Sequence, residues 1–327
     1  MLETLELVFG AVATKDIVPV MTHVCIHPGR MQGGDGVITI DAPFVCDLPP
    51  CAVPGQKFLN AVRACKGTPN LAMTDGGRLS VKKGSFKAFL SVLPEGQFPV
   101  DTVRGESVPV PSTLLKALKT IRPFVSKDAS RPWSMGVYLS ENYAYATNNV
   151  ILVRVPVDWN SGTDMGLSAM VLPTNAIDAL LDLQELPSEL HVDSTSATFT
   201  YNDGSWLKTR LTSAPWPNVA AMLDAAQLPT AIVQPELLEA VQKVKKFCTN
   251  VKFPTIQLSE EGVASDDGGG DIASVEGLQL PKSSYNGDML ELVLTHATYI
   301  DFTAYPKPCT FQGAGDLEGL FVGLLSA

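Results

Sequence analysis

The sequence has no long uninterrupted apolar run, and it carries little basic charge for its length. No run approaches the ~18 apolar residues that a membrane-spanning helix requires, so no membrane partner is expected. The 327 residues include 24 Lys and Arg against 34 Asp and Glu, which gives a net charge of −10. Binding nucleic acid over a whole surface needs an excess of Lys and Arg, so the charge argues against that class of protein. The acidic start, with Glu3 and Glu6, is unlike a secretory signal.

Metal-binding patterns are scarce as well. The six cysteines have no framework spacing, and no C-x-x-C pair is present. His23, Cys25 and His27 alternate, so they share one face of a strand, and Cys46 or Cys51 could complete four zinc ligands. Ordinary packing of a half-buried strand, with free thiols in a reducing compartment, is the favoured interpretation. No metal is predicted.

Familiar catalytic motifs are missing too. The chain contains no G-x-x-x-x-G-K-[ST], no G-x-S-x-G, no H-E-x-x-H and no G-x-G-x-x-G. Four histidines leave few candidates for general acid–base chemistry. The sequence therefore favours a binding or scaffold protein over an enzyme, and it indicates no cofactor.

Internal repeats are what the sequence does contain. Several segments can be laid over one another at a spacing of about 120 residues, near one third of the chain. Such a repeat constrains the fold more than any single motif. The matched pairs are residues 114–124 with 237–247, 139–142 with 258–261, 84–90 with 204–211, and 15–16 with 127–128.

Each repeat is expected to run helix, strands, helix, strands, which is an α+β fold. The expected first helices are 2–13, 113–122 and 235–247, and the second helices are 55–66, 173–183 and 287–296. Asn148-Asn149 and residues 266–270 are expected to form hairpin turns, and residues 106–111 and 224–229 are expected to be connectors. The predicted domains are residues 1–107, 108–224 and 225–327.

The expected helices carry charge unevenly. Helix 55–66 has Lys57, Arg63 and Lys66 with no acidic residue, and helix 113–122 has Lys116, Lys119 and Arg122 with none. Lysine is also common on any solvent-exposed helix face. For each helix taken alone, this interpretation is as good as binding to an anionic partner. Two acid-free basic helices in an acidic protein nevertheless shift the balance modestly toward an anionic partner.

Three segments, taken in order, resemble one family. Residues 77–94 with Phe98-Pro99, residues 146–152 and residues 321–325 are similar to segments of the bacterial β-type sliding clamp. That protein is the processivity subunit of the replicative DNA polymerase. The resemblance covers essentially the whole chain. The length and divergence suggest a phage or otherwise remote member of the family.

The resemblance implies a head-to-tail homodimer that closes into a ring of three clamp domains per chain around duplex DNA. It implies a non-enzymatic protein of the bacterial cytoplasm, or of an infected cell, whose partners are the replicative polymerase and a clamp loader. Lys15 falls by position at a basic DNA contact. The other inferred pore residues rest on helix location: Lys57, Arg63, Lys66, Lys116, Lys119, Arg122, Lys243 and Lys246.

The family also has a hydrophobic cleft that receives short peptide motifs of partner proteins. By position this cleft would be lined here by Thr147, Val150, Leu152, Pro229, Val322 and Leu324. Plain packing between domains is the competing interpretation of these residues.

Some positions depart from the family. Asn148-Asn149 replaces Asp-Gly, Val150-Ile151 replaces His-Arg, and the strand before the first helix has no counterpart. The alternative function is that of a β-rich viral structural or adaptor protein that assembles through its repeats, and a further possibility is a clamp relative that no longer binds DNA.

Overall fold

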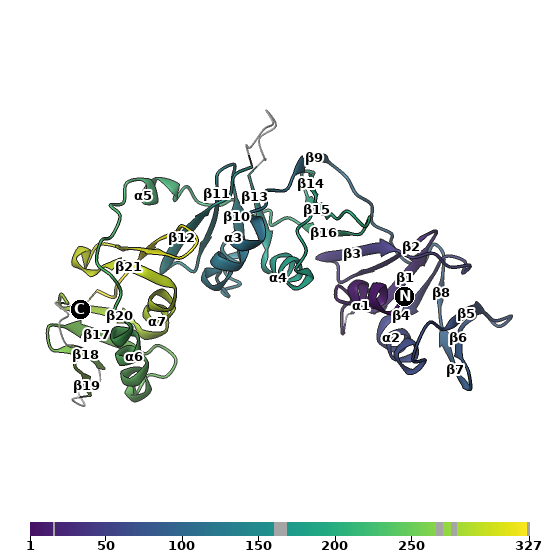
Figure 1. The fold of residues 1–327 in the computed structure, drawn as a ribbon, viewed down its shortest axis with the longest axis horizontal. Helices are drawn as coiled ribbons and strands as arrows, with labels where there is room; N and C mark the ends of the chain where they lie inside the picture. The colour runs from purple at the N-terminus through teal and green to yellow at the C-terminus, as the bar shows by residue number, and fades with distance from the viewer. Residues whose placement is uncertain (16, 160–168, 266–270, 276–279, 326–327) are drawn as a thin grey trace. The chain divides into compact units, whose positions relative to one another are not determined.

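The computed structural model describes residues 1–15, 17–159, 169–265, 271–275 and 280–325. The chain forms two compact units (Figure 1). Unit 1 comprises Met1–Leu115 and Ser161–Ser213, and unit 2 comprises Lys116–Asn160 and Ala214–Ala327. The turn expected at residues 266–270 lies outside the described residues. The division into three domains remains a prediction from the repeats.

Unit 1 is built on a nine-stranded sheet in the order β8-β4-β1-β2-β3-β16-β15-β14-β9. The register of its centre is set where β3 pairs antiparallel with β16, with Thr39 opposite Lys208. A second, three-stranded sheet has the order β5-β6-β7. The strands are β1 (His23–His27), β2 (Arg30–Gly34), β3 (Ile38–Pro43), β4 (Cys51–Pro54), β5 (Asn70–Met73), β6 (Arg78–Lys83), β7 (Phe86–Ser91), β8 (Leu93–Pro94), β9 (Glu106–Pro109), β13 (Met170–Pro173), β14 (Glu189–Val192), β15 (Ser196–Thr200) and β16 (Trp206–Arg210).

Three α-helices cover these strands: α1 (Leu2–Phe9), α2 (Gly55–Ala64) and α4 (Thr174–Leu183). Helix α1 packs on β2, β3 and α2, and it buries Leu5 and Val8 completely. Its approach to β2 is close, because a Cβ atom at Gly33 would lie 2.5 Å from the carbonyl oxygen of Val8. Only glycine fits at that position.

Unit 2 contains two sets of antiparallel β-strands. Strands β10-β11-β12-β23-β22-β21 lie side by side in that order, and β19-β18-β17-β20 form a four-stranded sheet. Strand β23, near the C-terminus, pairs with β12, so that Leu320 lies opposite Leu152. The strands are β10 (Gly136–Leu139), β11 (Tyr143–Thr147), β12 (Ile151–Pro156), β17 (Thr255–Ser259), β18 (Gly262–Ser265), β19 (Ile272–Ala273), β20 (Ser283–Asn286), β21 (Ala297–Asp301), β22 (Cys309–Gly313) and β23 (Leu317–Phe321).

The helices of unit 2 are amphipathic or capped as their sequences predict. They are α3 (Leu114–Ile121, whose first two residues fall in unit 1), α5 (Ala220–Asp224), α6 (Pro235–Val244) and α7 (Gly287–His296). In α3, Leu114, Leu118 and Ile121 are fully buried, whereas Lys116 and Lys119 on the other face are exposed. Helix α7 begins at Asn286, whose Oδ1 accepts hydrogen bonds from the backbone N–H groups of Asp288 and Met289.

Each of the six expected helices is present; α7 has the expected ends, and the other five are shifted at one end or both. Helix α1 was expected to end at residue 13. It ends at Phe9, and the chain turns at Gly10. A 3₁₀ helix, Arg122–Phe124, begins at the expected last residue of α3, and the last turn expected of α6 is the 3₁₀ helix Lys245–Phe247. Pro123 lacks the N–H that an α-helical hydrogen bond would need there. The remaining 3₁₀ turns are Pro19–Thr22, Pro132–Ser134 and Phe302–Ala304.

The prediction of a bare connector at residues 106–111 is wrong. Residues Glu106–Pro109 form β9, which pairs with β14 so that Val108 lies opposite Leu190. Val108 is half-buried there, and this burial outweighs the turn-forming tendency of proline. Pro109 lies at the end of an edge strand, where a missing N–H is tolerated. Among the described residues, no helix is both long and apolar enough to cross a membrane.

Candidate functional site

The turn between β11 and β12 organises the predicted partner cleft. The Asn148 side chain accepts hydrogen bonds from the backbone N–H groups of Val150 and Ile151, at 3.1 and 2.8 Å. Asn149 adopts a positive φ of 73°, which asparagine tolerates better than most residues. Thr147 is buried, and its hydroxyl donates to the carbonyl of Ile151. The turn leaves Val150 half-exposed beside the end of β23.

The chain leaving β23 runs alongside this turn. The N–H of Val322 donates to the carbonyl of Val150 at 3.0 Å, and the N–H of Leu324 donates to that of Ser284 at 2.7 Å. A Cβ atom at Gly323 would lie 2.7 Å from the Tyr305 ring, so only glycine fits at this position. Val322 and Leu324 are 42% and 40% exposed, so both present apolar surface to a partner.

An apolar cluster lies beneath this surface. Its buried members are Tyr145, Leu152, Leu223 and Leu320, which come from β11, β12, α5 and β23. The half-buried neighbours packed on it include Trp216, which stacks on Tyr138 with ring centroids 5.2 Å apart. The structure therefore joins the predicted cleft residue Leu152 to an apolar group that the sequence reasoning did not name.

Of the six predicted cleft residues, four are linked in two pairs, and Leu324 is hydrogen-bonded to Ser284, outside the set. Thr147 lies opposite Leu152 in the β11–β12 pair, and Val150 is hydrogen-bonded to Val322. The cluster takes its apolar side chains from residues 216–226 and not from Pro229, which is buried next to the exposed Leu228. In the sequence, the aromatic-proline pair Trp216-Pro217, which parallels Phe98-Pro99, is the signal that could have marked this segment.

An ion-pair network holds α5 over the cluster. Arg154 on β12, 9% exposed, donates to Asp224 at 2.5 Å and to Glu318 at 2.7 Å. Burial alone would lower the pKa of the Arg154 guanidinium, but its hydrogen bonds to Asp224 and Glu318 outweigh burial and raise that pKa. Because Asp224 follows Leu223 directly, the ion pair keeps Leu223 packed on the cluster.

The predicted DNA-contacting residues of unit 1 lie on its surface. Lys15, Lys57 and Lys66 are exposed and have no acidic partner within the described part of the chain. Arg63 on α2 donates to Glu6 on α1 at 2.8 Å, so part of its charge is neutralised. Of these three lysines, Lys57 lies on α2, whereas Lys15 and Lys66 lie beyond the ends of α1 and α2.

Unit 2 carries the other predicted basic residues. Lys116, Lys119 and Lys246 are exposed, Arg122 is half-buried, and Lys243 pairs with Glu239 at 3.3 Å. Lys116 and Lys119 have no acidic partner among the residues that the structure describes. The neighbouring Lys245 is held by Asp288 and Glu291, so it adds no free charge.

The histidine–cysteine pattern on β1 has structural partners. The His23 ring nitrogen Nδ1 lies 2.8 Å from the Pro19 carbonyl, and His27 Nε2 lies 2.9 Å from Asp41. Cys25 is buried, and this burial raises the pKa of its thiol to about 12. Within the described ranges, no group of three His, Cys, Asp or Glu side chains is arranged to hold a metal ion.

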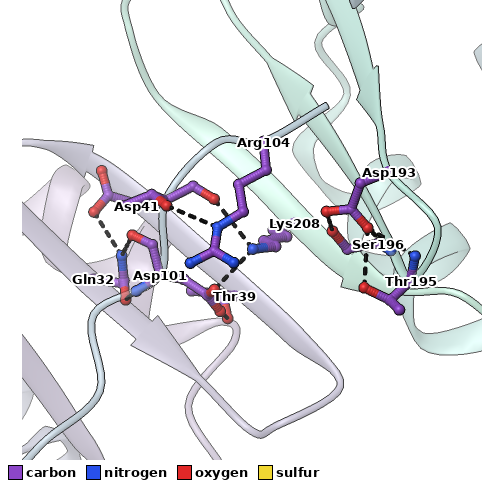
Figure 2. A network of polar contacts seen from close by, with 10 residues as sticks. Gln32, Thr39, Asp41, Asp101, Arg104, Asp193, Thr195, Ser196 and Lys208 are labelled. Carbon is purple, nitrogen blue, oxygen red and sulfur yellow. Dashed lines mark hydrogen bonds and ion pairs between the residues drawn. The ribbon is translucent and has the colours of Figure 1, made fainter. Parts of the chain in front are cut away.

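A buried carboxylate joins three strands of unit 1. The Asp41 side chain is fully buried and accepts hydrogen bonds from Gln32, at 3.0 Å, and from Arg30, and it lies 2.9 Å from His27. Figure 2 shows Gln32 between Asp41 and Asp101. The same Gln32 amide donates to the Asp101 carbonyl at 3.1 Å and accepts from its N–H at 2.7 Å. The network thus ties residues 99–104 to the sheet.

We expect Asp41→Ala to lower the free energy of unfolding by about 3–5 kcal/mol, because it leaves Arg30 and Gln32 without their buried acceptor. Asp47→Ala, at an exposed position, is the matched control and should change it by less than about 0.5 kcal/mol. Urea unfolding followed by circular dichroism measures both values. A loss below about 1 kcal/mol for Asp41→Ala would show that this network adds little to stability.

Comparison with known proteins adds a fold-level finding. No protein-family model and no curated protein matches the chain. The DNA polymerase sliding clamp from Bacillus subtilis has a TM-score of 0.81 and 16% identity, with 100% of this chain and 97% of that chain covered. The pol III beta of Caulobacter crescentus has a TM-score of 0.84 and 19% identity, with 99% and 97% covered.

The beta subunit of DNA polymerase from Streptococcus pyogenes is similar in the same way. Its TM-score is 0.80 at 17% identity, with 99% of this chain and 97% of that chain covered. The likeness thus extends over nearly the full length of both chains, and it confirms both the α+β fold predicted from the repeats and the clamp fold that the resemblance implied. From end to end, this chain has the fold of the bacterial DNA polymerase sliding clamps.

Proposed function

We propose that the protein is a DNA sliding clamp, a non-enzymatic ring of clamp domains, three per chain, that holds a replicative DNA polymerase on duplex DNA. The observation that carries this proposal is the full-length likeness to sliding clamps. Exposed lysines on the helices add to it, because a ring that slides needs only a loose, sequence-independent attraction to phosphate. Processivity then comes from the topological link.

Lys116 and Lys119 are the best candidates for the DNA-facing surface. They lie three residues apart on the exposed face of α3, and within the described chain neither has an acidic partner. The other proposed contacts are Lys15, Lys57, Arg63, Lys66, Arg122, Lys243 and Lys246. In a protein of net charge −10, we propose that these basic residues are the ones that face DNA.

The double variant Lys116→Glu, Lys119→Glu should shorten the half-life of retention on circular DNA about tenfold at low salt, because two phosphate-facing charges become repulsive. The difference from wild type should shrink as salt rises. A bead-based retention assay on nicked circular and linearised plasmid, with the clamp loader present, measures this.

The control carries the same change in charge away from these helices. Lys282→Glu with Lys307→Glu alters two exposed residues and should leave retention unchanged. Equal retention of wild-type protein on circular and linear DNA would refute the clamp proposal. Large assemblies with no retention on DNA would instead support a structural or adaptor protein.

Unit 2 presents an exposed patch that suits self-association. Phe247, Val251 and Phe253, here called the phenylalanine patch, are 60%, 86% and 64% exposed. They lie on the turn and loop between α6 and β17. Large apolar side chains gathered in this way on a surface mark an interaction site.

Unit 1 offers a surface of different character. Strand β7 is an edge of the three-stranded sheet, and Phe89 on it is 41% exposed beneath Arg78 and Lys87. The β17–β18 turn of unit 2 carries Glu260 and Glu261. A basic sheet edge on one unit and an acidic turn on the other favour pairing between unlike surfaces of two copies. Such heterologous contacts close into a head-to-tail ring, which is the proposed homodimer.

The proposed partner cleft consists of the apolar cluster and the exposed residues at its rim. We propose that the partly exposed Val150, Val322 and Leu324 form its rim and that the buried Thr147 and Leu152 form its floor; Pro229 stays a proposed member by position only. A short apolar motif of a polymerase or clamp loader would bury its side chains against Leu152 and Leu324.

A further inference from the structure

We propose that a polar cavity in unit 1 binds an acidic, extended peptide segment of a partner protein. This site is separate from the partner cleft of unit 2, and its biological role rests on the proposed clamp function. The cavity has a volume of about 850 Å³, which is the size range of ligand pockets. Strands β1–β3, residues 99–104, residues 193–196 and residues 208–213 line it.

The backbone around this cavity repeats the backbone around the unit 2 cleft. The Asp35 side chain accepts hydrogen bonds from the N–H groups of Val37 and Ile38, both at 2.8 Å. Asn148 does the same for Val150 and Ile151. Gly36 has a positive φ of 86°, and the equivalent Asn149 has a positive φ of 73°. The two turns therefore have the same backbone hydrogen bonds and occupy equivalent positions in successive repeats.

The strand that leaves each site repeats as well. The N–H of Arg210 donates to the Val37 carbonyl at 2.9 Å, as that of Val322 donates to Val150. The N–H of Thr212 donates to the Val171 carbonyl at 3.2 Å, as that of Leu324 donates to Ser284. The fold thus builds the same groove twice, once in each unit.

The side chains make the two grooves chemically different. In register, Thr39 and Lys208 of unit 1 take the places of Leu152 and Leu320 in unit 2. Gln32, opposite Asp41, takes the place of Tyr145, opposite Arg154. An apolar peptide suits the groove of unit 2, whereas the groove of unit 1 requires a polar ligand.

The charge of the lining determines which polar ligand fits. The Asp101 carboxylate is already occupied by Lys208, at 2.8 Å, and by Thr39, at 3.1 Å. Asp193 is occupied by hydrogen bonds from Thr195 and Ser196, which hold the pKa of its carboxyl well below the usual range. Both acidic groups of the lining are therefore satisfied internally.

Two guanidinium groups of the lining remain available. Arg104 and Arg210 are exposed, and neither has an acidic partner among the described residues. Arg104 and Lys208 both contact Thr102, so two cations lie close together, as Figure 2 shows. Repulsion between like charges is relieved by an anion, and a carboxylate can accept two parallel hydrogen bonds from one guanidinium.

The remaining lining favours a peptide over a nucleotide. Among the described residues of the lining there is no Phe, Tyr or Trp, and the His23 ring nitrogen Nδ1 already lies 2.8 Å from the Pro19 carbonyl, so a nucleobase would find little on which to stack. Gly34 and Gly36 are half-buried and expose part of their backbone, and the hydroxyl groups of Thr195 and Ser196, which donate to Asp193, can still accept hydrogen bonds. Backbone and hydroxyl groups are suitable hydrogen-bond partners for the main chain of an extended peptide.

The test measures the affinity of the full-length protein for a fluorescein-labelled peptide of six residues, Ser-Glu-Glu-Ser-Glu-Glu, by fluorescence anisotropy. The peptide in which each Glu is Gln is the neutral comparison. We expect saturable binding of the acidic peptide only. The double variant Arg104→Glu, Arg210→Glu should weaken it about tenfold, and added salt should weaken it for wild type.

Two further variants keep the outcome interpretable. Lys282→Glu with Lys307→Glu carries the same charge change away from the cavity and should retain wild-type affinity. Ser194→Trp, at an exposed lining position, narrows the cavity without changing charge and should also weaken binding. Absence of saturable binding, equal binding of the neutral peptide, or unchanged affinity in the Arg104 and Arg210 variant overturns this proposal.

The experiments distinguish a wrong assignment of the cavity site from a wrong assignment of the clamp function. The Arg104 and Arg210 variant should keep wild-type retention on circular DNA, because neither residue is proposed to face DNA. Retention on DNA without peptide binding refutes the cavity site alone. Peptide binding at the cavity without topological retention on DNA refutes the clamp function alone.

Discussion

The double variant Phe247→Asp, Phe253→Asp is expected to be a monomer and to lose retention on circular DNA. Both side chains are more than half exposed in the single chain, so the change should not disturb the core. Burial of two phenylalanines in a dimer contributes several kcal/mol, and aspartate there would add a desolvation cost. We expect the dimer dissociation constant to rise at least about 100-fold. Size-exclusion chromatography with light scattering measures the mass at several concentrations.

The matched control for the phenylalanine patch is Val45→Asp. Val45 is 91% exposed in unit 1, far along the sequence from the patch, and its replacement should leave the dimer intact. A variant that remains a dimer would show that the phenylalanine patch is not the self-association surface. A wild-type protein that is strictly monomeric at micromolar concentration would count against the ring itself.

Leu324→Asp is expected to weaken binding of a polymerase-tail peptide about 30-fold while leaving the dimer unchanged. Leu324 is 40% exposed at the rim of the apolar cluster, and its backbone hydrogen bond to Ser284 does not involve the side chain. A carboxylate at this position would be desolvated by an apolar peptide. Fluorescence anisotropy with a labelled peptide from a polymerase C-terminal tail measures the change.

Leu186→Asp serves as the control for the cleft, because Leu186 is 37% exposed and lies in unit 1. It should bind the peptide as wild type does. Undiminished binding to Leu324→Asp would refute the assignment of the cleft. The dimer should persist in both variants, so that a loss of peptide affinity cannot be attributed to loss of the ring.

Local patterns in the sequence were sufficient to predict the helices and the repeat. Apolar residues at helical spacing predict α3 and α6, and the repeat spacing indicates that the two helices are equivalent. Helix ends were less predictable, because they depend on single residues such as Gly10 and Pro123. The strand at Glu106–Pro109 was missed because its only stabilising neighbour, β14, lies some 80 residues later in the sequence.

Long-range polar contacts account for most of what the sequence could not indicate. Asp41 and Arg154 are single charged residues in otherwise apolar strands, and nothing local marks their partners. Arg154 meets Asp224 and Glu318 only after β12 and β23 have paired. Likewise, Leu223 becomes part of the partner cleft only because α5 folds back onto β12. Such residues are recognised once the sheet register is known.

The pairing of β12 with β23 has a consequence for how the chain is made. Residues 151–156 leave the ribosome long before residues 317–321, and the two strands are neighbours in the finished sheet. Closing so long a loop is slow, and until it closes, β12 exposes an unpaired edge. The nascent unit 2 therefore depends on residues 317–321 to complete its sheet. Deletion of the final dozen residues should leave a chain prone to aggregation rather than a shorter stable protein.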